Sequence, residues 1–131
     1  MPVEIRIAAL GALLLVVHII IATQLKTNQY GAKWNMGARD EGVPAPTPLT
    51  GRMIRAQANF QETFPIAIVA LLGVAFAGRT SPTTALGGWI WLTARAAYIP
   101  LYAAGVPVVR TLTFTISIVG LAMVIWPLLL G

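Results

Sequence analysis

Four apolar segments, each about as long as a helix that crosses a bilayer, constrain this chain more than any other feature. They cover roughly residues 5–25, 58–77, 85–104 and 111–130. A helix needs about 20 apolar residues to cross the hydrocarbon core, so each segment is predicted to be one span. Only 10% of the residues are charged, whereas soluble domains carry about 25%. We therefore expect a single domain, residues 1–131, that is all-α and forms an integral membrane four-helix bundle.

Composition also excludes several kinds of site. The formal net charge is +5, but the nine basic residues are spread between apolar runs and form no basic patch with interleaved aromatic residues. The chain has no cysteine, which excludes disulfides, thiolate metal ligands and cysteine nucleophiles. One histidine, His18, cannot form a multi-histidine metal site alone and more often donates a hydrogen bond between helices. We predict neither a metal site nor a nucleic acid partner.

The distribution of basic residues predicts the orientation in the membrane. The only long connection, about residues 26–50, contains Lys26, Lys33 and Arg39. Its glycines and the run Pro44-Ala-Pro46-Thr-Pro48 indicate irregular or extended structure. Because cytoplasmic loops are rich in lysine and arginine, we expect this loop in the cytoplasm and both termini on the other side. The first apolar run is long and lacks a cleavage site, so we interpret it as a retained span.

Polar side chains gather where the chain enters the second span. Arg52, Arg55, Asn59 and Glu62 recur at spacings of three and four, which places them on one face of a helix. Charged side chains at membrane depth are costly and usually face protein or water. This face is therefore predicted to form part of a polar site.

The third and fourth segments contribute polar residues at the same end of the bundle. Arg95, Tyr98 and Tyr102 share one face of the third segment, and Arg110 opens the fourth. Four arginines thus converge with Glu62 as the only carboxylate, which indicates an anion-binding site. The ligand expected there carries carboxylate or phosphate groups and an amine, as a small peptide or amino-acid-like anion does.

Each residue also has a structural interpretation. Glu62 and Arg95 could form a buried ion pair between neighbouring helices. Arg52, Arg55 and Arg110 could anchor the chain at lipid headgroups. Tyr98 and Tyr102 could belong to an interfacial aromatic belt, as Trp34, Trp89, Trp91 and Trp126 do in our interpretation.

Two motifs resemble one known family. Arg52-Met-Ile-Arg55-Ala56-Gln-Ala-Asn59-Phe-Gln-Glu62-Thr63-Phe-Pro65 resembles the start of the second span in MAPEG proteins (membrane-associated proteins in eicosanoid and glutathione metabolism). Arg95-Ala-Ala-Tyr98-x-x-x-Tyr102, followed by Arg110-Thr111, resembles the third span and the start of the fourth. The segment Gly37-Ala-Arg39-Asp40 resembles the loop of bacterial members. The similarity covers nearly the whole chain.

The resemblance implies a homotrimer that binds glutathione between subunits at the cytoplasmic side. It implies glutathione-dependent transfer or peroxide reduction on small lipophilic electrophiles, in a bacterial inner membrane with both termini periplasmic. Arg110 and Thr111 would be catalytic, with Arg110 stabilising the glutathione thiolate. The residues expected to bind glutathione or substrate are Arg52, Arg55, Asn59, Glu62, Arg95, Tyr98 and Tyr102.

Three positions depart from the eicosanoid-processing members of that family. Ala58 replaces an arginine, Tyr98 replaces a histidine, and Phe114 replaces a tyrosine. The departures at Ala58 and Phe114 motivate a second hypothesis, in which the chain is a non-catalytic scaffold or a subunit of a larger membrane complex. A third hypothesis, a small four-span exporter, is disfavoured because Glu4 is the only acidic residue in the first segment and lies at its edge.

Overall fold

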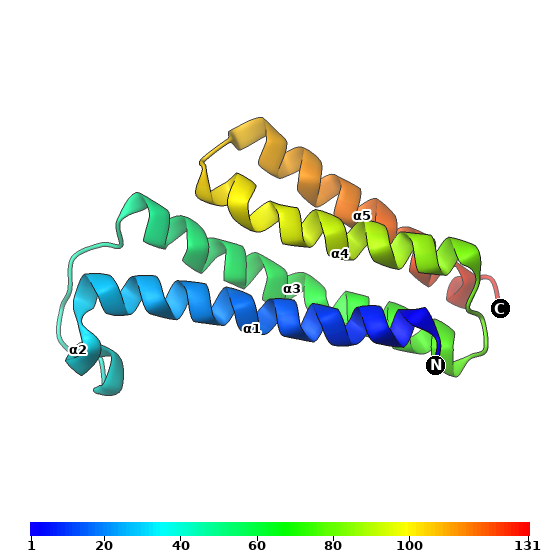
Figure 1. Cartoon of the computed structure of the whole chain (residues 1–131), viewed down its shortest axis with the longest axis horizontal. Coiled ribbons are helices and arrows are strands. Elements are labelled where there is room, and N and C mark those ends of the chain that lie inside the picture. The colour runs from blue at the N-terminus through cyan, green and yellow to red at the C-terminus, as the bar shows by residue number, and fades with distance from the viewer.

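The computed structural model describes residues 1–131 as an all-helical chain without strands, which confirms the predicted fold class. Four long helices and one short helix follow one another (Figure 1). Their bounds are α1 Val3–Tyr30, α2 Ala32–Met36, α3 Pro48–Phe76, α4 Pro82–Ala103 and α5 Pro107–Leu129.

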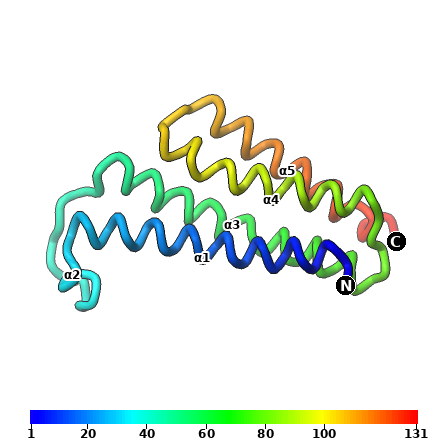
Figure 2. Tube along the Cα trace, viewed as in Figure 1, coloured from blue at the N-terminus to red at the C-terminus, as the bar shows by residue number.

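The long helices form two antiparallel pairs (Figures 1 and 2). α1 packs against α3, and α4 makes its most extensive contacts with α5. α3 contacts all three other long helices, whereas α2 contacts only α1. Both termini and the α3–α4 connection lie at one end, which we call the terminal end. α2, the start of α3 and the α4–α5 turn lie toward the opposite end, which we call the loop end.

Prolines mark three of the helix starts. Pro48, Pro82 and Pro107 each occupy the first turn, where the missing N–H costs no hydrogen bond. Thr47 and Ser81 cap α3 and α4 through their side chains, but no side chain caps α5.

The connection between α1 and α3 is tied back to α1. α1 continues to Tyr30, and α2 forms inside this connection. The Tyr30 hydroxyl donates a hydrogen bond to the Pro44 carbonyl (2.7 Å), and the Thr47 amide donates one to the Gln29 side chain (3.0 Å). The proline-rich segment therefore lies across the end of α1.

Three helices, α1, α3 and α5, are long and apolar enough to cross a membrane. α4 is not among them, although its 22 residues would extend about 33 Å. Its polar side chains include Trp91, Arg95 and Tyr98, which are buried against the bundle and so do not face lipid. Because α4 lies alongside α5 (Figure 1), we retain as a prediction that it also crosses.

The main core lies between all four long helices, with Leu121 and Val124 contributed by α5. Phe60 stacks against His18, with ring centroids 5.0 Å apart, and against Phe64, at 5.2 Å; Trp91 lies beside both phenylalanines. Gly87 and Gly120 allow α4 and α5 to approach closely, because a Cβ on either glycine would lie 2.6 Å from the backbone oxygen of the other.

A buried hydrogen bond joins α1 to α4 at the terminal end. Glu4 is 2% exposed and accepts a hydrogen bond from the Thr84 hydroxyl (2.5 Å). Thr84 also belongs to the capping box that begins α4. Glu4, which the sequence places only at the edge of a span, thus holds two helices together.

Candidate functional site

A small cavity toward the loop end of α3, α4 and α5 collects most of the polar residues that the sequence singles out. Its volume is about 270 Å³, and we call it the mixed-charge pocket. Three helices contribute its lining residues, which are Arg55, Ala58, Asn59, Glu62, Tyr98, Tyr102 and Arg110. The i, i+3, i+4 spacing on α3 brings its members to one face, and antiparallel packing brings α4 and α5 beside them.

A second cavity adjoins the first and shares Arg55, Tyr102 and Arg110 with it. Its volume is about 230 Å³. Arg52 contributes the third guanidinium of its lining, and no carboxylate is present. We call it the arginine pocket. The remaining lining residues are Pro48, Gly105, Val106 and Pro107.

Tyr102 organises the boundary between the two pockets. Its hydroxyl accepts a hydrogen bond from Arg55 Nε (3.0 Å). The Arg110 guanidinium lies over its ring, with the Cζ atom 5.3 Å from the centroid. Tyr98 packs on the other side, with the ring centroids 5.4 Å apart. One tyrosine thus positions two arginines from different helices.

Arg95 lies behind this boundary and lines neither pocket. It is 0% exposed, and its Cζ atom lies 4.5 Å from the Tyr98 ring centroid, 5.4 Å from that of Phe60 and 5.7 Å from that of Phe114. None of its guanidinium nitrogens has a hydrogen-bond partner. The suggested Glu62–Arg95 pair is therefore wrong for this chain: aromatic rings surround Arg95, while Glu62 is exposed at the mixed-charge pocket.

Two buried polar atoms near the pockets have no protein partner. They are Asn59 Oδ1, an acceptor, and Arg52 Nε, a donor. A buried polar atom without a partner costs roughly 1–3 kcal/mol. Asn59 Oδ1 can therefore accept a hydrogen bond from a ligand, and Arg52 Nε can donate one to a ligand.

Thr111 is not brought into either pocket. It lies exposed on the outer side of α5, in a groove of about 560 Å³. The lining of that groove is Pro107, Val108, Arg110, Thr111, Leu112 and Thr115. Arg110 therefore borders both the mixed-charge pocket and this α5 groove.

The structure adds residues that sequence reasoning did not select. Gly105, Val106 and Pro107 line the arginine pocket, and their Gly-x-Pro sequence was interpreted only as a break between helices. Phe114 lies over Arg95, although sequence reasoning noted it only as a departure from related proteins. Neither role has a local signal, because both depend on how α4 and α5 pack.

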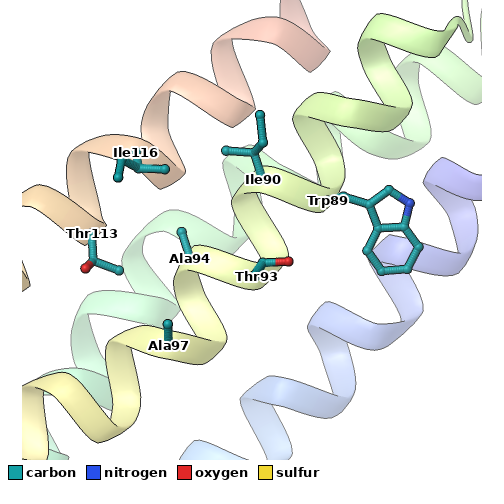
Figure 3. Close-up of a pocket in the computed structure, with 7 residues that line it drawn as sticks. All are labelled: Trp89, Ile90, Thr93, Ala94, Ala97, Thr113 and Ile116. Atoms are coloured by element: carbon teal, nitrogen blue, oxygen red, sulfur yellow. The ribbon is translucent and has the colours of Figure 1, made fainter.

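One lateral groove shares no lining residue with the two polar pockets. It lies between α4 and α5, has a volume of about 460 Å³ and contains no ionisable side chain (Figure 3). Its lining is Trp89, Ile90, Thr93, Ala94, Ala97, Thr113 and Ile116. It offers no charged side chain to a charged ligand, so the two polar pockets remain the candidate site.

Comparison with known proteins gives one match. The model of the MAPEG family matches residues 7–130, nearly the whole chain. No curated protein and no solved structure matches the chain.

Proposed function

Since the chain belongs to the MAPEG family, whose members include glutathione-dependent transferases and peroxidases, we propose that it is one of these enzymes. It transfers glutathione to lipophilic electrophiles, or uses glutathione to reduce lipophilic peroxides. The observation that carries this proposal is the mixed-charge pocket, where Arg55, Asn59, Glu62 and Arg110 line one cavity.

The residues of this pocket fit glutathione group by group. Glutathione has two carboxylates and one amine. Arg55 and Arg110 offer guanidinium groups that bind carboxylates well. Glu62 and the unpaired Asn59 Oδ1 are acceptors for an ammonium group. A simple dianion would leave Glu62 without a partner.

Arg110 is the residue that we propose to act on the thiol. Glutathione supplies the sulfur nucleophile, which reacts as a thiolate. The Arg110 guanidinium beside the sulfur would favour the charged form. Arg110 also borders the α5 groove, where the apolar Pro107, Val108 and Leu112 lie beside Thr111 and Thr115. A lipophilic substrate entering that groove from the bilayer would meet the sulfur at Arg110.

The site is incomplete in one chain, which supports the proposed homotrimer. Arg55 and Glu62 are exposed on a helix that is otherwise apolar enough to cross a membrane. Lipid contact with these charges would be costly. Each pocket is also smaller than the roughly 300 Å³ at which small-molecule sites begin. A neighbouring copy would both cover the charges and complete the cavity.

The test is conjugation of glutathione to a chlorinated nitroaromatic by the purified protein. Arg55→Ala should mainly raise the KM for glutathione, and Arg110→Ala should mainly lower kcat, each by about tenfold or more, because each loses a charge-assisted interaction. Arg79→Ala, at an exposed position in the α3–α4 connection, should retain the parent activity.

Equal activity in all three variants would contradict the site assignment. Calorimetric titration of the parent with glutathione separates the remaining alternative. Absence of binding, together with a stoichiometric co-purifying protein, would favour the scaffold hypothesis over an enzyme.

A further inference from the structure

The arginine pocket carries more positive charge than the proposed glutathione site requires. Arg52, Arg55 and Arg110 all line it, and no acidic residue does. The mixed-charge pocket, by contrast, includes Glu62 and suits a ligand with both signs of charge. The arginine pocket therefore suits a group that is purely anionic.

The N-terminus of α5 adds to this positive potential. Val106 and Pro107 line the pocket, and no side chain caps the helix. The first N–H groups of a helix have no intrahelical acceptor and carry a partial positive charge. Pro107 has no N–H, so it is the partial positive charge of the helix start, beside the three guanidiniums, that favours an anion in the pocket.

The Arg52 guanidinium lies close to the α4–α5 turn, where Gly105 has a φ of +73°. A Cβ at Gly105 would lie 3.4 Å from an Arg52 terminal nitrogen, so glycine leaves room for the guanidinium. Arg52 Nε is buried without an acceptor, and therefore has a donor available.

The position of the pocket along the bundle indicates the source of the anion. Arg52, Gly105, Pro107 and Arg110 all lie outside the apolar segments and beside the α4–α5 turn. With the apolar segments in the hydrocarbon core, these positions are expected at the depth of the lipid headgroups. Anionic lipids concentrate phosphate there and attract basic residues.

We propose that the arginine pocket binds the phosphate of an anionic membrane lipid. Arg52 is its principal ligand, and Arg55, Arg110 and the start of α5 contribute. The site is separate from the glutathione thiol chemistry but shares two arginines with it, so a bound lipid also holds those side chains in place.

The experiment measures lipid binding directly, by native mass spectrometry of the purified protein with phosphatidylglycerol or phosphatidylcholine. The parent protein should bind phosphatidylglycerol about tenfold more tightly, as charge-assisted hydrogen bonds predict. Arg52→Gln should abolish this preference, and Arg52→Lys, which keeps the charge but not the planar fork, should retain part of it. Arg79→Gln is the matched control and should keep the full preference.

Three results would overturn the proposal. One is an unchanged preference in Arg52→Gln, with circular dichroism confirming that the variant is folded. The second is an Arg52-dependent dissociation constant for inorganic phosphate as low as that for the lipid, which would identify free phosphate as the ligand. The third is an Arg52→Gln variant with unaltered lipid binding but a raised KM for glutathione, which would assign the pocket to a glutathione carboxylate.

Discussion

Tyr102 is the residue on which the two polar pockets depend most directly. Its hydroxyl receives a hydrogen bond from Arg55, its ring faces Arg110, and Tyr98 supports it from behind. Tyr98 in turn lies against the buried Arg95. Arg95 touches neither pocket, so we expect it to influence the site through Tyr98 and Tyr102, as a positioning residue.

Replacement of the Tyr102 hydroxyl should affect binding more than chemistry. Tyr102→Phe keeps the ring under Arg110 but removes the acceptor for Arg55 Nε. We expect the KM for glutathione to rise about tenfold with kcat nearly unchanged, because a hydrogen bond to a charged group contributes about 1.5 kcal/mol or more. Steady-state kinetics at several glutathione concentrations provides the measurement.

Tyr30→Phe is the matched control for this variant. The Tyr30 hydroxyl likewise makes a hydrogen bond, which it donates to Pro44, but Tyr30 is the last residue of α1 and lies outside both pockets. It should keep the parent KM. A Tyr102→Phe enzyme with an unchanged KM would show that Arg55 needs no alignment by Tyr102.

At the scale of helices, the pair α4 and α5 depends on two glycines that face each other. A side chain at Gly87 or Gly120 would clash with the backbone of the opposite helix. Neither helix can relieve such a clash by changing a rotamer, because backbone atoms are involved. The separation of α4 and α5 determines how Tyr102 and Arg110 meet, so this contact also supports the site.

Each single alanine substitution at these glycines should therefore destabilise the protein. Gly87→Ala and Gly120→Ala are each expected to cost about 1–3 kcal/mol, the usual cost of overpacking a tight contact. Thermal unfolding in detergent measures the effect. The double variant should cost less than the summed single effects, since one displacement of the helices relieves both clashes.

Gly42→Ala is the matched control, because nothing lies within 4 Å of a Cβ at that position. It should unfold within a few degrees of the parent. If Gly87→Ala and Gly120→Ala are both as stable as Gly42→Ala, then α4 and α5 do not approach each other this closely in the folded protein.

At the scale of the whole molecule, the two ends of the bundle differ in chemistry. The loop end carries both polar pockets and the arginines that line them, whereas the terminal end carries the Glu4–Thr84 hydrogen bond and both chain termini. The positive-inside bias predicts that the loop end faces the cytoplasm. Glutathione, a cytoplasmic thiol, would then reach its proposed site without crossing the membrane.

This orientation can be tested cleanly because the chain has no cysteine. Single cysteines at Gly42, in the long connection, and at Thr80, in the α3–α4 connection, both replace exposed residues. In intact cells, a membrane-impermeant maleimide should label Thr80→Cys and leave Gly42→Cys unlabelled until the membrane is opened. The reverse pattern would place the arginines and the pockets outside.

The sequence by itself determined the fold class, the membrane location and the polar character of the site. These properties are local, because helix length, hydropathy and residue spacing follow from neighbouring positions along the chain. The same spacing selected every charged residue of the mixed-charge pocket, and the two motifs identified the family that the comparison confirmed.

Only the tertiary structure decided which pocket, buried cluster or surface each of those residues occupies. It separated the arginine pocket from the mixed-charge pocket. It enclosed Arg95 in aromatic rings and did not place it beside Glu62. It also left Thr111 exposed on α5 and joined Glu4 to Thr84 by a hydrogen bond. Each outcome depends on the rotation of one helix about its axis and on its distance from another. Those quantities are set by packing between residues far apart in the chain, such as Gly87 and Gly120, and no local pattern contains them.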